Sequence, residues 1–126
     1  MRRDLVNNED YVQSVAPAAY AASVNGAGVD LRDFDGAMMV VDPGAVTDGT
    51  HTPKMQESDD DSTYTDVAAA DMEKTLAAIA ASTVQRVGYK GNKRYVRAVV
   101  TVAGATTGGV YGVGFVRGLP HSSPVA

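Results

Sequence analysis

The fold is decided by residues 94–103, RYVRAVVTVA, because apolar and polar side chains alternate along this stretch. One face carries Val96, Ala98, Val100 and Val102, and the other carries Tyr95, Arg97, Val99 and Thr101. A period of two residues sustained over the whole stretch predicts a β-strand.

The segments on either side continue the pattern. After a glycine-rich loop at 104–109, residues 110–117 alternate large apolar side chains with Gly112 and Gly114. Glycines on one face of a strand leave room for another sheet, a side chain or another copy to approach closely. On the other side, residues 84–89 alternate as well, and a turn at 90–93 joins them to the central stretch.

Shorter strands are predicted earlier in the chain, the first at 19–24 before a turn at 25–28. The unbroken apolar run AMMVV at 37–41, bounded by turn residues, predicts a buried strand. Residues 51–58 alternate again, and Pro53 indicates an edge or the start of a strand because proline has no N–H to donate. An acidic turn at 59–62 then leads into a returning strand at 64–67.

This spacing predicts an all-β fold, an antiparallel β-sandwich or jelly roll of about seven or eight strands. We expect the sandwich domain to cover 20–118, with an N-terminal arm at 1–19, where Pro17 interrupts any continuous element, and a C-terminal tail at 119–126. Residues 68–82 leave two readings open. Asp71 could cap a short helix with Met72, Leu76, Ile79 and Ala80 on one face, or the segment could be a loop with a strand.

Composition narrows the class of protein. A chain of 126 residues without cysteine suits one domain with no disulfide and no cysteine-based zinc site. There is no secretory signal pattern and no apolar run of about 20 residues, so we expect a soluble protein, made in the cytoplasm, with no membrane partner. A sequence pI of about 4.9 argues against specific nucleic-acid binding.

Charge is divided unevenly along the chain. Residues 1–82 hold 15 acids and 5 bases, a formal charge of −10, whereas 83–126 hold 6 bases and no acid, so the two parts sum to the net −4. Opposite charges on separate surfaces would let neighbouring copies attract one another.

The residues that could carry chemistry do not form a site. Asp59, Asp60, Asp61 and Asp66 could bind calcium, but the spacing lacks the glycine and distal glutamate of an EF-hand, which favours a solvated turn. His51 and His121 have no nearby ligand partners of motif quality, and no nucleophile motif or phosphate loop occurs. We therefore expect no enzyme, no metal site and no cofactor.

Two groups of residues are candidates for partner binding. Lys90, Lys93, Arg94 and Arg97 form a basic hairpin, which is either a solvated turn and edge or an interface for carboxylates of another subunit. The chain ends contribute Arg2 and Arg3 and, at the other terminus, Leu119, Pro120 and His121, which could dock on a partner in extended form.

Several stretches resemble small proteins encoded among the head genes of tailed bacteriophages and prophages. They are VDLRDFDGA (29–37), GAVTDGTHT (44–52), QESDDDSTYTDV (56–67), VGYKGNKRYVR (87–97) and GFVRGLPH (114–121), and the resemblance covers most of residues 5–125. It implies a virion protein that decorates, or cements, the outer surface of a capsid and binds the major capsid protein as a dimer or trimer. The alternatives are a carbohydrate-binding jelly-roll module on the virion surface and a head-completion or tail component.

Overall fold

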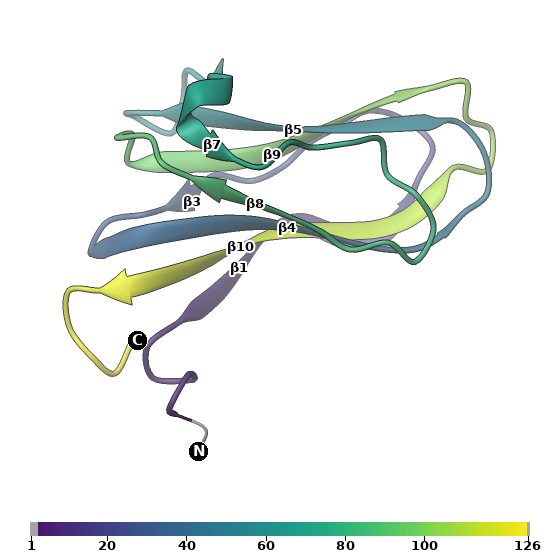
Figure 1. The fold of residues 1–126 in the computed structure, drawn as a ribbon. Coiled ribbons are helices and arrows are strands. Elements are labelled where there is room, and N and C mark those ends of the chain that lie inside the picture. Colours follow the sequence, from purple (N-terminus) through teal and green to yellow (C-terminus); the bar gives the residue numbers. More distant parts are fainter. Residues whose placement is uncertain (1–2, 126) are drawn as a thin grey trace.

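The computed structural model describes residues 3–125 and contains two antiparallel sheets of five strands each, packed face to face (Figure 1). Sheet A has the order β1 (Asp10–Tyr20), β10 (Gly109–Pro120), β4 (Phe34–Val46), β8 (Gln85–Tyr89) and β7 (Met72–Glu73). Sheet B has the order β2 (Val24–Asn25), β9 (Tyr95–Ala103), β5 (Thr50–Ser58) and β6 (Thr65–Asp66), with β3 (Val29–Asp30) also paired to β9. The predicted β-sandwich is confirmed.

The core fills the space between the inner faces of the two sheets. From β10 it takes Tyr111, Val113 and Phe115, and from β9 it takes Val96, Ala98 and Val100, all of them at most 1 % exposed. These are the positions that the alternation in the sequence selected, because successive side chains of a strand point to opposite faces. A side chain as large as Phe115 contributes on the order of 2–3 kcal/mol by leaving water.

A polar bridge crosses this core. His51 of β5 is 1 % exposed, and its Nε2 lies 3.0 Å from the carbonyl oxygen of Asp48, which can only accept a hydrogen bond. Nε2 therefore carries the proton, and Nδ1 accepts a 2.9 Å bond from the hydroxyl of Tyr111 on β10. The bond links the inner faces of sheets B and A.

The N-terminal arm predicted at 1–19 is wrong from residue 10 onward, because residues 10–20 form β1, an edge strand of sheet A paired with β10. Val12 lies opposite Phe115 and Val15 opposite Val113, so both side chains face the core. Pro17 did not prevent the strand, since it falls within a register shift between positions 15 and 18 and on the sheet edge.

Other boundaries also move. No strand covers 19–24, because β1 ends at Tyr20 and β2 begins at Val24. The C-terminal tail predicted at 119–126 begins later, since β10 continues through Pro120, which lies opposite Phe34. Pro53 matches its prediction: β5 pairs with β9 there, and β6 reaches only positions 56 and 57, so the proline lies on a locally free edge.

Residues 68–82 are a loop with short elements, which decides between the two readings left open. A single 3₁₀ turn, η1 (Ala69–Asp71), precedes β7, and the rest runs along the open side of the sandwich between β7 and β8 (Figure 1). Ile79 is buried, and its N–H donates to the carbonyl of His51, while Met72 and Leu76 also pack on the core. The apolar spacing therefore marks core contacts made by an extended chain, without a helix.

Ser14 closes the opposite side of the sandwich. Its hydroxyl donates to the carbonyl of Ala27 at 2.7 Å and accepts the N–H of Ala98 at 2.9 Å, which ties β1 of sheet A to sheet B. Gly26 fits here because a Cβ atom would lie 2.2 Å from the Ser14 hydroxyl oxygen. Within the described residues, no helix is long and apolar enough to cross a bilayer.

Candidate protein-binding surfaces

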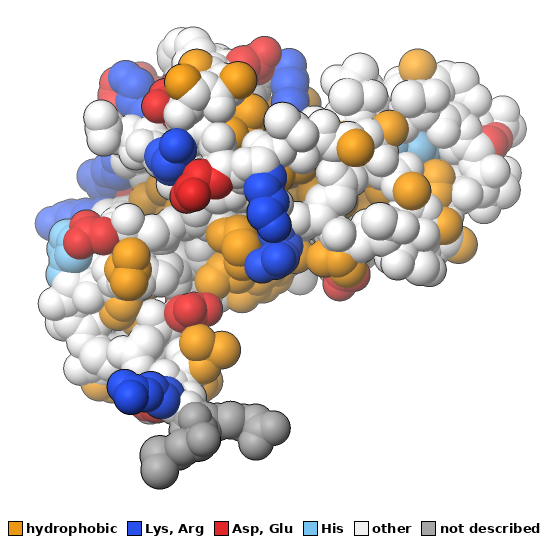
Figure 2. Space-filling view, in the orientation of Figure 1, with side chains coloured by type: hydrophobic (Ala, Val, Ile, Leu, Met, Phe, Trp, Pro, Cys, Tyr) orange, Lys and Arg blue, Asp and Glu red, His pale blue; other side chains and the backbone are white. Residues whose placement is uncertain are grey.

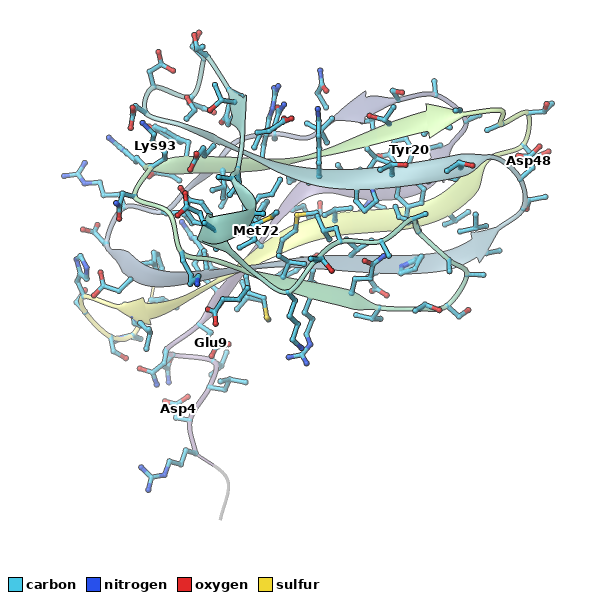
Figure 3. All side chains as sticks on the ribbon, turned by 45° about the horizontal axis from the view of Figure 1, so that its top comes forward. Asp4, Glu9, Tyr20, Asp48, Met72 and Lys93 are labelled. Atoms are coloured by element: carbon cyan, nitrogen blue, oxygen red, sulfur yellow. The ribbon has the colours of Figure 1, made fainter. Side chains whose placement is uncertain are left out.

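One end of the sandwich collects most of the residues predicted to bind partners, and we call it the terminal end. The two terminal segments lie at this end, below sheet A in Figure 1, and the β3–β4 and β8–β9 loops lie above them at the same end. The two terminal segments bind each other, since the N–H of Val125 and the hydroxyl of Ser123 both donate to the carbonyl of Asn7 at 3.0 Å. In Figure 3, Lys93 marks this end and Asp48 marks the opposite one.

An open cleft of about 400 Å³ lies at the terminal end, between the β3–β4 and β8–β9 loops. It is lined by Lys93, Arg94 and His121 among other residues, so the fold brings together three of the predicted binding residues. Asp33 and Asp35 line the same cleft, which makes it mixed in charge.

Two of the four basic side chains of the hairpin are neutralised within the chain. Lys93 Nζ lies 2.8 Å from Asp59 Oδ2, and Arg94 binds both carboxylate oxygens of Asp30, at 3.0 and 2.8 Å. The Arg94 hydrogen bonds hold the pKa of Asp30 below its usual value, and Asp59 raises the pKa of Lys93. Lys90 is exposed and has no ion pair among residues 3–125.

Arg97 does not join the cleft. Its guanidinium lies 4.2 Å from the ring centroid of Tyr64 and donates to the side-chain oxygen of Gln56, both on the outer face of sheet B. The four basic residues of the hairpin therefore do not form one patch.

The uneven charge along the sequence is not an uneven charge in space. Arg117 of the basic third binds Asp10 of the acidic part, just as Lys93 and Arg94 bind Asp59 and Asp30. Antiparallel pairing brings late strands beside early ones, and the two signs meet within one chain. The division of charge along the sequence therefore no longer supports a basic surface that binds carboxylates of another subunit.

The C-terminal candidates have separate surroundings. His121 Nε2 lies 2.8 Å from Asp35 Oδ1, and this contact raises the pKa of the imidazole. Leu119 and Pro120 both belong to the end of β10, and the Leu119 side chain is 70 % exposed.

The N-terminal segment presents an apolar surface that the sequence analysis missed. Arg2 lies outside the described residues and Arg3 is exposed. The larger feature is a hollow of about 320 Å³ whose lining is Leu5, Val6, Glu9, Asp10, Tyr11 and Val116. Leu5 and Val6 are 63 % and 79 % exposed. Two adjacent aliphatic residues in an otherwise polar segment were the available signal.

The outer face of sheet A continues this apolar surface, because Tyr11 and Val116 belong to both. One row across it carries Tyr11, Val116, Met38, Gly88 and, at the sheet edge, Glu73, and the next carries Gln13, Gly114, Val40 and Arg86. Figure 2 shows hydrophobic side chains gathered along β4 and β8 beside basic ones. The run at 37–41 was predicted to be buried throughout, but its alternate side chains Met38 and Val40 are only partly buried on this face.

The acidic turn is held by hydrogen bonds, as the sequence suggested. Asp60 Oδ1 accepts the N–H groups of Ser62 and Thr63 at 3.0 Å, and Ser58 Oγ accepts those of Asp60 and Asp61 at 3.1 Å. The bonds from Thr63 and Ser62 lower the pKa of Asp60. Within residues 3–125 no three acidic or histidine side chains are placed to hold a metal ion.

The distinctive features of the described residues are the exposed apolar surfaces at the terminal end and on sheet A. Comparison with protein-family models, with curated proteins and with solved structures finds no match to this chain.

Proposed function

We propose that the protein is a structural virion component, a decoration protein that binds the outer surface of a bacteriophage capsid and links neighbouring major capsid subunits. The sequence stretches quoted above support the class of protein. The observation that carries the binding role is the exposure of Leu5 and Val6 beside an apolar hollow at the terminal end. Exposed apolar side chains around a hollow are typical of surfaces that another protein covers.

The terminal end provides the capsid contact in this proposal. Leu5 and Val6 supply apolar area, and unpaired charges such as Lys90 lie on the neighbouring loop. Each contact can be weak, because many copies on a repeating lattice act together and the combined effect resists expansion of the shell.

Co-sedimentation tests the proposal directly. Purified protein is mixed with capsids that lack it, and bound copies are counted by quantitative mass spectrometry. Decoration predicts saturation at many copies per particle and greater heat stability of the decorated capsids. Failure to co-sediment, together with unchanged heat stability of virions that lack the protein, would contradict it, and a few copies per virion would indicate a head-completion or tail component.

Surface variants locate the contact. Leu5→Asp and Val6→Asp should weaken capsid binding at least about tenfold, because burial of one aliphatic side chain contributes about 1.5–3 kcal/mol. Val84→Asp is the matched control, since Val84 is also aliphatic and 56 % exposed but lies just before β8. Equal loss in all three variants would rule out the terminal end as the specific contact.

A further inference from the structure

On the outer face of sheet A, side chains of β1 lie over the glycines of β10. Gly114 and Gly112 of β10 carry no side chain there, and the Tyr11 ring lies across Gly114, where a Cβ atom would be 2.4 Å from the ring. The Tyr11 hydroxyl therefore lies over β10, and burial together with the nearby Asp42 carboxylate raises its pKa. Met38 and Val40 continue the same surface.

Two charged side chains of opposite sign flank Val40 on this face. Arg86 lies directly opposite Val40 on β8, and Asp42 follows two residues later on β4, so all three point outward. Both charged residues are exposed, and neither has an ion pair among residues 3–125. Lys54, Lys93, Arg94 and Arg117 each bind a carboxylate of the same chain, whereas Arg86 and Asp42 are left without such a partner among residues 3–125 and are available to another molecule.

We propose that the outer face of sheet A binds the same face of a second copy of this chain. The twofold axis lies in the interface, between the sheet A faces of the two copies, and crosses the midpoint of the line from Arg86 to Asp42 at a right angle. It therefore exchanges the positions of these two residues. It places Arg86 of each copy against Asp42 of the other and passes close to Val40. The diagonal spacing of about 7–8 Å in an antiparallel ladder keeps the two reciprocal ion pairs adjacent to the apolar centre.

The charge pattern around Val40 favours a second copy of the chain over an unrelated protein as the binding partner. A single-signed patch would require a complementary partner, whereas one cation and one anion on either side of an apolar residue form a self-complementary surface. The outer face of sheet B has no such arrangement, because Lys54 already binds Asp66 and Arg97 already binds Gln56.

The area of the outer face of sheet A limits the affinity that the dimer can reach. Four strands at about 4.8 Å and three rows at about 6.8 Å cover about 400 Å² per copy, which is below the roughly 800 Å² per partner of stable complexes. We therefore expect a weak, concentration-dependent dimer in the purified protein, a result that does not depend on capsid binding.

Charge reversal tests the pairing. Sedimentation equilibrium of the full chain should show a monomer–dimer equilibrium, and Arg86→Asp or Asp42→Arg alone should weaken it about tenfold or more. The double variant should recover association, because it restores both ion pairs with their signs exchanged. Lys54→Asp on sheet B is the control and should leave the equilibrium unchanged.

Cross-linking provides an independent readout. The chain has no cysteine, so Val40→Cys places a single thiol near the proposed axis, and a short bis-maleimide should join two copies. Thr52→Cys, on the outer face of sheet B, should not cross-link. A protein that stays monomeric at all concentrations, or single reversals without effect, or a double variant that does not recover would overturn the proposal.

Discussion

The outer faces of the two sheets differ, although their inner faces build one core. On sheet B, Lys54 binds Asp66, Arg97 binds Gln56 and stacks on Tyr64, so polar side chains satisfy one another across three strands. On sheet A, Met38 and Val40 lie beside glycines, and Arg86 has no ion pair among the described residues.

The difference shows how an antiparallel sandwich can assign its two surfaces to different tasks. A face whose polar groups are already paired has little to offer a partner, because binding must break those contacts or bury them. A face with apolar rows and unpaired charges gains from being covered. Variants that act differently on the two faces of one sheet, or on the two sheets, test this distinction.

The largest expected effect separates the two faces of a single strand. Phe115→Ala removes a fully buried side chain of β10 and should lower the free energy of unfolding by about 3–5 kcal/mol. Val116→Ala, next along the strand but on the outer face, should cost about 1 kcal/mol or less. Urea unfolding followed by circular dichroism measures both, and similar costs would mean that the outer face is already covered.

The second effect concerns the polar bridge between the sheets. Tyr111→Phe removes the hydroxyl that donates to His51 Nδ1 and should cost about 1–3 kcal/mol, because a buried acceptor is left unsatisfied. Burial raises the pKa of Tyr111 to about 12, so the hydroxyl is protonated at neutral pH. Tyr20→Phe is the control, since the Tyr20 ring stacks on Tyr111 but its hydroxyl bonds an exposed carbonyl. Thermal unfolding should show a larger loss for Tyr111→Phe, and equal losses would mean that the buried bond to His51 contributes no more than the exposed bond of Tyr20.

A smaller effect compares one arginine from each outer face. Arg97→Ala should lower the free energy of unfolding of the monomer by about 1 kcal/mol, because it removes a cation–π contact and a hydrogen bond on sheet B. Arg86→Ala should change it by less than about 0.5 kcal/mol, since Arg86 has no partner among residues 3–125. The two free energies of unfolding are compared at a protein concentration that favours the monomer. A larger loss for Arg86→Ala would show that Arg86 does have a stabilising partner within the chain.

The smallest effect is the pH response of the terminal end. Asp35 raises the pKa of His121, so the contribution of this pair to stability is present below about pH 6.5 and is lost as the pH rises through the folded pKa. Both side chains are exposed, and the change should be slight. An NMR titration should place the His121 pKa above that of a model histidine, and Asp35→Asn should lower it. An identical pKa in the variant would exclude the pairing.

The strands of the C-terminal third could be predicted from sequence alone. Apolar and polar side chains alternate between neighbouring residues at 94–103, and this signal does not depend on contacts with other strands. Residues 10–20 were missed because Pro17 disfavours a regular strand, and only pairing with β10 reveals the register shift that accommodates it. The sequence could not distinguish a helix from a loop at 68–82, because Met72, Leu76 and Ile79 would face the core in either structure.

The binding surfaces were less accessible to sequence reasoning. Lys93 and Asp59 are 34 positions apart and Arg94 and Asp30 are 64 apart, so their pairing depends on the strand order, which no local pattern specifies. The apolar run at 37–41 did contain a signal. An antiparallel strand with one solvated face should alternate, and an unbroken run therefore indicates either burial on both faces or an outer face that a partner covers.

The hydrogen bond between Val125 and Asn7 has a practical consequence for engineering. Because both chain ends are held at one location, a short peptide could join them, and new ends could be opened in the loop at 104–108, at the far end from Lys93. A circular permutant of this kind would carry fused cargo away from the proposed capsid contact.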